Sequence, residues 1–188
     1  MHPAISQWRL REAARCFHSG GILAYPTEAV YGLGCDPMDW IAVERILEIK
    51  RRPVDKGLIL IAADFQQLLP FVKPLSDEEL QIPFDTWPGP TTWLLPAAEH
   101  TPPWLTGEHE TLAVRVTAHP IAAALCRACG SPLVSTSANI SDRPPARSAL
   151  QTRLRLGRHV DHIVSGPVGG KPKPTPIRDL TSGRTLRA

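Results

Sequence analysis

Two short polar segments carry the side chains that could bind an anion. Lys50, Arg51 and Arg52 come directly before a proline, at the expected end of a helix, and concentrate positive charge there. The segment STSAN at residues 135–139 follows an apolar run and adds hydroxyl and amide groups at the expected end of a strand. Ammonium, guanidinium, hydroxyl and amide groups all bind phosphate or carboxylate oxygens. The two segments therefore predict an anion site of a kind that suits a nucleoside triphosphate.

The common glycine-rich nucleotide loops do not occur in this sequence. The strand-like residues 22–25 lead into PTEAVYGLG instead of the G-x-G-x-x-G turn of a Rossmann fold. Gly169, Gly170 and Lys171 imitate the end of a P-loop, but Ser165 replaces its first glycine and Pro172 replaces the magnesium-binding Ser or Thr. We interpret residues 165–176 as a flexible loop that could cover a ligand.

Composition and charge fit one cytoplasmic domain. A chain of 188 residues has the length of a single domain, so we expect one domain over residues 1–188. A net charge of +3 permits RNA as a partner without requiring it. No apolar run approaches the roughly 20 residues that cross a membrane, and no signal-peptide pattern opens the chain. We therefore expect a cytoplasmic location and no membrane partner.

The cysteines and histidines do not predict a metal site. Cys126 and Cys129 form a C-x-x-C pair, but no second pair completes a zinc site, so buried free thiols are the simpler interpretation. His159 and His162 lack an evident third ligand and are expected at the surface.

Helical and strand-like segments alternate along the chain. Helices are expected at residues 10–17, 39–50, 64–72, from a capping box at 76–79, at 120–130 and at 148–156. Strands are expected at residues 22–25, 57–63, 91–95, 111–117, 132–135 and 163–164, with two final strands joined by a turn at 181–184. This order predicts an α/β fold with a sheet of mixed direction. Arg115 alternates with Val114 and Val116 and is expected on the opposite face.

Five motifs in this order resemble the YrdC/TsaC family: YPTEAVYGLG (25–34), KRRP (50–53), WPGPTT (87–92), AVRV (113–116) and STSAN (135–139). The likeness covers nearly the whole chain and is closest to the short bacterial form, which lacks an additional C-terminal domain. The resemblance implies an α/β (α+β) fold, a single YrdC-like domain with a twisted mixed sheet and flanking helices around a positively charged concave cavity.

The resemblance also implies threonylcarbamoyl-AMP synthase activity. L-Threonine, bicarbonate and ATP, the last with Mg²⁺, would give threonylcarbamoyl adenylate and pyrophosphate, without a tightly bound cofactor. Downstream transfer proteins would then carry the threonylcarbamoyl group to an adenosine beside the anticodon of tRNA. Because the carboxylate, carbamate and triphosphate repel one another, a cationic cavity is the main requirement, and no general base is needed.

The family's motifs assign roles to particular residues. Lys50 and Arg52 match its K-x-R motif, Ser137 and Asn139 match its S-x-N motif, and these four are expected to be catalytic. The residues expected to bind ATP are Lys50, Arg52, Lys56, Thr111, Ser137, Asn139 and Arg187. Those expected to bind threonine are Thr27, Tyr31, Arg115, Ser135 and Thr175.

Two positions depart from the family's pattern. The segment PTPI at residues 174–177 replaces the common P-S-T-I, which keeps a hydroxyl at Thr175 and removes one at Pro176. Ile61 stands where many longer members carry a His that touches threonine, so apolar packing is expected there instead.

Plainer interpretations of the same residues stay open at this point. Cations can simply balance a helix C-terminus, and hydroxyl groups at a strand end can satisfy nearby backbone groups. A basic cavity could also serve an RNA-binding module that makes no adenylate, which would show a steep salt dependence and no need for small molecules. A hydrogenase-maturation carbamoyltransferase contains a similar domain, but this chain is too short to include that protein's other domains.

Overall fold

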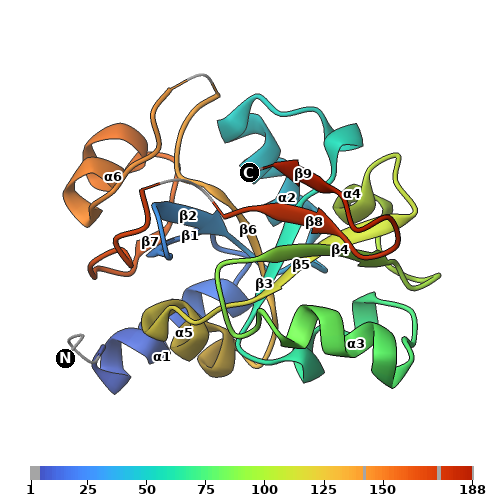
Figure 1. Cartoon of the computed structure of the whole chain (residues 1–188). Coiled ribbons are helices and arrows are strands. Elements are labelled where there is room, and N and C mark those ends of the chain that lie inside the picture. The colour runs from blue at the N-terminus through green and yellow to red at the C-terminus, as the bar shows by residue number, and fades with distance from the viewer. Residues whose placement is uncertain (1–4, 142, 173–174, 188) are drawn as a thin grey trace.

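A nine-stranded sheet in the order β7-β1-β2-β6-β3-β5-β4-β8-β9 organises the chain (Figure 1). The structure is a computed structural model that describes residues 5–141, 143–172 and 175–187. Residues 1–4, where a signal-peptide pattern was sought, and Pro174 of the PTPI segment lie outside the described residues.

Helices and strands alternate over most of the chain. The strands are β1 (Leu23–Pro26), β2 (Tyr31–Gly34), β3 (Ile59–Ala62), β4 (Thr92–Pro96), β5 (Thr111–Val116), β6 (Leu133–Ser137), β7 (His162–Ile163), β8 (Ile177–Asp179) and β9 (Thr185–Arg187). The α-helices are α1 (Gln7–His18), α2 (Trp40–Lys50), α3 (Asp77–Phe84), α4 (Pro103–Thr106), α5 (Pro120–Cys129) and α6 (Ala149–Leu156). Short 3-10 helices are η1 (Val54–Lys56), η2 (Phe65–Gln67) and η3 (Leu69–Phe71).

The sheet is mixed, as the sequence predicts. The pairs β1–β7, β3–β5 and β4–β8 are parallel, whereas β1–β2, β2–β6, β3–β6, β4–β5 and β8–β9 are antiparallel. The expected helix starts at Asp39, Ser76 and Ser148 are confirmed, because each side chain accepts a hydrogen bond from a backbone N–H of the first turn. Ser76 and Glu79 complete the capping box.

Two local predictions differ from the structure. The helix predicted at residues 64–72 is wrong: two 3-10 turns occupy this segment, since Pro70 has no N–H to continue an α-helix. Strand β2 was not foreseen, because it follows β1 after only residues 27–30 and contains two glycines. The turn between these strands carries Thr27 and Glu28.

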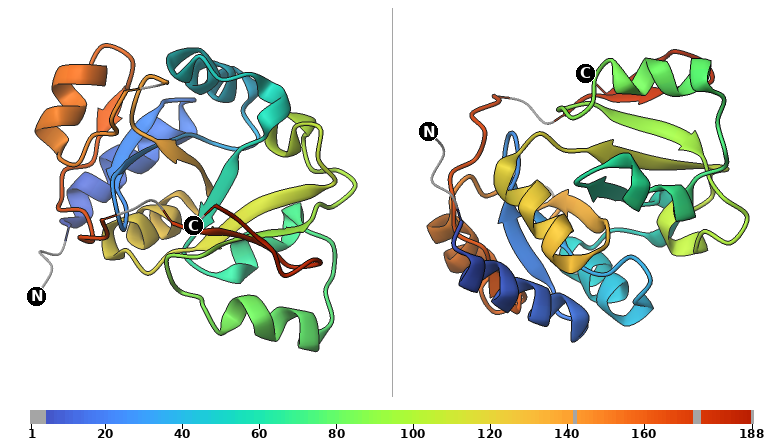
Figure 2. Two further views of the ribbon diagram at one scale, coloured as in Figure 1. Left: turned by 45° about the horizontal axis from the view of Figure 1, so that its top comes forward. Right: turned by 90° about the horizontal axis from the view of Figure 1, so that it is seen from below.

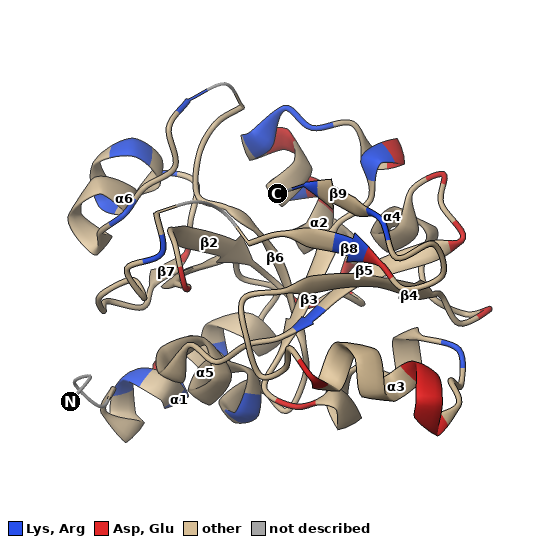
Figure 3. Ribbon diagram, in the orientation of Figure 1, with Lys and Arg blue, Asp and Glu red and all other residues tan. Residues whose placement is uncertain are grey.

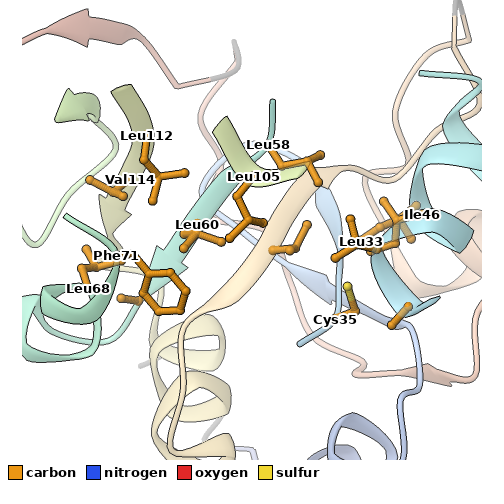
Figure 4. Close-up of a cluster of buried hydrophobic side chains, with 14 of the residues drawn as sticks. Leu33, Cys35, Ile46, Leu58, Leu60, Leu68, Phe71, Leu105, Leu112 and Val114 are labelled. Atoms are coloured by element: carbon orange, nitrogen blue, oxygen red, sulfur yellow. The ribbon is translucent and has the colours of Figure 1, made fainter. Parts of the chain in front are cut away.

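Hydrophobic side chains cover the two faces of the sheet differently. Ile46 of α2 packs with Leu33 and Leu60 on one face, in a cluster that continues to Leu105 and Phe71 (Figure 4). On the other face, α1 and α5 lie together against Leu23, Tyr25, Ile61 and Leu133 (Figure 2).

Candidate active site

The half of this second face that α1 and α5 leave uncovered forms the floor of a cavity. Along β6, the buried Leu133 gives way to Ser135 and Ser137, which pair in register with Ile59 of β3 and Gly32 of β2, respectively. Ala113 pairs with Ile59 and continues the same row on β5. Small and hydroxyl-bearing side chains therefore replace the hydrophobic core at this end of the face.

The cavity has a volume of about 680 Å³, which is within the usual range of ligand sites. Every residue that the sequence predicts to bind substrate lines it: Thr27, Tyr31, Lys50, Arg52, Lys56, Thr111, Arg115, Ser135, Ser137, Asn139, Thr175 and Arg187. The structure thus brings together segments that are up to 160 positions apart (27 to 187) in the sequence.

The end of α2 directs two cations into the cavity. Arg51 adopts a left-handed conformation with φ of 48°, and the backbone N–H groups of Arg51 and Arg52 bond back to the carbonyls of Glu48 and Leu47. This is the Schellman pattern of a helix C-terminus, which glycine usually occupies. The reversal of the chain at Arg51 lets both Lys50 and Arg52 line the cavity while Arg51 is exposed.

Lys50 is bound to the S-x-N segment. Its Nζ donates to the carbonyl oxygen of Ser137 at 2.7 Å, to Oδ1 of Asn139 at 2.9 Å and to the carbonyl oxygen of Asn139 at 3.1 Å. Ser137 Oγ in turn donates to Asn139 Oδ1 at 2.6 Å. An ammonium has three donors, so these contacts use all of them. Lys50 therefore organises Ser137 and Asn139, and contact with a ligand requires one of these bonds to be exchanged.

Arg52 keeps donors for a ligand. Its Nη2 donates to the carbonyl oxygens of Lys56 and Gly57 at 3.0 and 2.9 Å, which fixes the guanidinium against the η1 turn. Its Nη1 makes no hydrogen bond to the described residues. This group is oriented by the protein and still has N–H groups for an anion.

Arg115 lies where the covered half of the face meets the cavity, and it is 5% exposed. Its Nη1 donates to Thr175 Oγ1 at 2.7 Å, and its Nη2 is 3.6 Å from Glu28 Oε2. The Nε of Arg115 has no partner among the described residues. A buried guanidinium with unused donors is suited to a carboxylate ligand.

Thr175 connects this arginine to a second one. The carbonyl oxygen of Thr175 accepts from Nε and Nη2 of Arg187 at 3.1 and 2.7 Å. Burial lowers the pKa of Arg187, and the nearby charges of Arg115 and Arg52 lower it further. Arg187 is therefore close enough to both other guanidinium groups to be repelled by them when no anion is bound.

The residues that line the cavity are strongly cationic. Lys50, Arg52, Lys56, Arg115 and Arg187 line the cavity, and no Asp or Glu does so among the residues that the structure describes. Burial, and then the charge of Arg52, lower the pKa of Lys50 to about 8. In Figure 3 the basic positions at the end of α2 and on β8 and β9 lie well apart from the acidic first turn of α3. A field of this sign attracts anions.

The threonine-site candidates at the β1–β2 turn are fixed by residues 165–172. Tyr31 Oη donates to the carbonyl oxygen of Gly166 at 2.6 Å and accepts from its N–H at 3.0 Å. Thr27 Oγ1 donates to the carbonyl oxygen of Val30 at 2.7 Å, and its own carbonyl accepts from Gly169. The glycines of the imperfect P-loop do not line the cavity; this segment supports its wall instead.

Other expectations have mixed outcomes. Ile61 is fully buried beneath α5 and does not line the cavity, so its packing belongs to the core and not to the substrate site. The four cysteines are free thiols, and no group of three potential metal ligands occurs within the described part of the chain. His109 lines the cavity and was not foreseen, since it belongs to no recognised motif.

Comparison with known proteins decides the family. A model of the Sua5/YciO/YrdC family, described as telomere recombination, matches residues 15–188. The chain belongs to this family. It is 54% identical over 184 residues to a threonylcarbamoyl-AMP synthase of Nitrosococcus oceani, covering 98% of this chain and 100% of that protein. It is 49% identical over 178 residues to the synthase of Coxiella burnetii, covering 95% and 96%.

A solved Sua5/YciO/YrdC structure agrees with the fold. The structure of P. abyssi Sua5 complexed with L-threonine has a TM-score of 0.89 and 37% identity, and the match covers 95% of this chain and 53% of that one. The chain thus spans about half of that relative's length. The predicted YrdC-like mixed α/β fold is confirmed. Among the described residues, no helix combines the length and hydropathy needed to span a bilayer.

Proposed function

We propose that this chain is a threonylcarbamoyl-AMP synthase, a nucleotidyltransferase that converts L-threonine, bicarbonate and ATP to threonylcarbamoyl adenylate and pyrophosphate. Relatives with this name match nearly the whole chain at about half identity. The observation that carries the proposal is the cavity lined by five cationic side chains, with no carboxylate among its described lining residues.

The reaction explains why such a lining is useful. The amine of threonine condenses with bicarbonate to a carbamate and releases water. A carbamate oxygen then bonds to the α-phosphorus of ATP as the bond to the leaving pyrophosphate breaks. Each step brings anions together, so fixed cations lower the repulsion and hold the reactants in line.

The geometry favours two ends of one site. Arg115 would bind the threonine carboxylate, with Thr27, Tyr31, Ser135 and Thr175 around the amino acid. Its unused donors and its hydrogen bond to Thr175 support this assignment. The amine would then point toward the S-x-N segment, where carbamate and phosphate meet.

The other end would bind the nucleotide. Arg52 would offer Nη1 to the phosphates, and Lys56, Thr111 and Arg187, which line the same cavity, would assist it. Lys50 would hold Ser137 and Asn139 in place and supply charge next to the reacting phosphate. Mg²⁺ would enter as part of the ATP substrate, held by phosphate oxygens, because the described lining offers no carboxylate ligand.

The product would pass to other proteins. Threonylcarbamoyl adenylate is a mixed anhydride that can acylate an amine, so downstream transfer proteins would use it to modify tRNA in the cytoplasm. Direct contact of this chain with RNA is not needed for the reaction.

The decisive experiment is a product assay. The purified protein is incubated with ATP, Mg²⁺, threonine and isotopically labelled bicarbonate, and pyrophosphate and labelled adenylate are measured. We expect both products only when all substrates are present. ATP binding without labelled adenylate, combined with RNA binding that weakens steeply with salt, would refute the synthase proposal in favour of an RNA-binding module.

A further inference from the structure

Glu28 is a buried carboxylate with no role in the reaction as described above. It is 6% exposed and lies in the β1–β2 turn, directly after Thr27. It is absent from the cavity lining, which otherwise includes Thr27, Ala29 and Val30 from the same turn. Buried carboxylates are costly unless they are paired, so its presence here calls for a partner.

The protein fixes Glu28 from two sides. Thr117 Oγ1 donates to Glu28 Oε1 at 2.6 Å and itself accepts from the N–H of His119 at 3.0 Å. The segment at residues 165–172 covers the backbone: Lys171 N–H donates to the Glu28 carbonyl at 2.9 Å, and a Cβ added at Gly169 would lie 3.0 Å from Glu28 Cα. The carboxylate therefore has little freedom to move.

The free oxygen of this fixed carboxylate faces Arg115. Glu28 Oε2 is 3.6 Å from Arg115 Nη2, which is too long for a hydrogen bond, and neither Oε2 nor Arg115 Nε has a hydrogen-bond partner among the described residues. The pair thus neutralises the buried guanidinium without consuming its donors. Thr175 holds the opposite end of the guanidinium through Nη1.

We propose that Glu28 is a positioning residue that orients the Arg115 guanidinium for the carboxylate of the amino-acid substrate. This inference rests on the proposed function. Glu28 and Thr175 hold the guanidinium between them, and its remaining N–H groups serve the ligand. The orientation is set before substrate arrives, which reduces the ordering that binding requires.

Charge alone would have the opposite effect. A carboxylate 3.6 Å from Arg115 weakens the attraction between that arginine and a second carboxylate. Removal of the Glu28 charge would therefore strengthen threonine binding if electrostatics dominated, and would weaken it if positioning dominates. The two explanations predict changes of opposite sign.

The test compares Glu28→Gln with Glu28→Asp. In Glu28→Gln we expect the KM for threonine to rise about tenfold or more, with kcat within about threefold and the KM for ATP within about twofold of wild type. Glu28→Asp keeps the charge on a shorter side chain and should restore part of the threonine affinity. Glu44→Gln, on an exposed part of α2, is the matched control and should behave as wild type.

A double-mutant cycle tests whether Glu28 acts through Arg115. Threonine binding is measured by calorimetry for Glu28→Gln, Arg115→Lys and the double variant. We expect the loss from Glu28→Gln to disappear in the Arg115→Lys background. If Glu28→Gln does not fold, as judged by circular dichroism, Thr117→Val replaces it, because this change removes the hydroxyl that fixes the carboxylate.

Two results would overturn the inference: threonine affinity in Glu28→Gln equal to or tighter than wild type, or an undiminished loss in the Arg115→Lys background. A wild-type protein that releases no pyrophosphate in response to threonine would instead overturn the proposed function. The wild-type assay separates these two failures.

Discussion

Replacement of Lys50 by methionine separates its structural role from its catalytic one. Methionine keeps most of the stem and removes the ammonium that bonds to Ser137 and Asn139. Three charge-assisted hydrogen bonds at about 1.5 to 3 kcal/mol each are lost. Two effects reduce the stability lost with these bonds. Burial of the ammonium is unfavourable, as the lowered pKa of Lys50 indicates, and in the variant water can reach the freed oxygens from the cavity. We expect a net loss of about 2 kcal/mol.

The loss is measurable by unfolding. For a chain of this size, about 2 kcal/mol lowers Tm by roughly 4 to 8 °C. Pyrophosphate release should fall by about 10²-fold or more, because the S-x-N segment loses its anchor beside the reacting phosphate. Lys56→Met is the matched control: Lys56 also lines the cavity but is exposed, so its replacement should leave Tm unchanged. A Lys50→Met protein as stable as wild type would refute the reasoning.

Three further outcomes follow from the site. The pKa of Lys50 is about 8 in the folded protein and near 10.5 in the unfolded chain, so the unfolded chain binds the proton more tightly. Between pH 8 and 10.5 the contribution of Lys50 to the free energy of unfolding therefore rises with pH, which urea unfolding over this range checks. The value of kcat/KM should instead fall above pH 8 as the ammonium is lost, which a pH–rate profile checks. Arg51→Gly should raise stability by about 1 kcal/mol with unchanged turnover, because glycine adopts the left-handed conformation without strain, and a loss of stability would contradict this. Arg52→Met should abolish most pyrophosphate release with Tm within about 2 °C of wild type, since its anchors are exposed or half-buried carbonyls; a large drop in Tm would show that it acts mainly in folding.

The sequence predicted which residues share the cavity better than it predicted the local path of the chain. The K-x-R and S-x-N motifs were recognisable because phosphate chemistry limits the side chains that can serve, and both motifs line the cavity. The prediction of a helix at residues 64–72 was wrong because it gave more weight to the hydrophobic spacing than to Pro70, which cannot donate a backbone hydrogen bond. Strand β2 was missed because four residues with two glycines give no clear period.

The sequence did not predict which side chains contact each other across long distances along the chain. Lys50 was expected to face a ligand. Only the fold shows that its N–H groups are bonded to Ser137 and Asn139, which are 87 and 89 positions further along the chain. Glu28 stood within a recognised motif, yet its relation to Arg115 depends on the approach of β1 and β5 from separate parts of the sheet. Residue types at a site can be inferred from motifs, whereas their mutual orientation comes from tertiary contacts.

The described residues that line the cavity include no Asp or Glu, so the cavity holds departing anions as readily as arriving ones. Under the proposed reaction, pyrophosphate and the adenylate both leave against the attraction that gathered their precursors. Product release, and not the chemical step, would then limit kcat. Hydrolysis of the released pyrophosphate by another enzyme would shift the reaction equilibrium toward the adenylate. The same positive charge that brings the anionic substrates together thus slows the release of the anionic products.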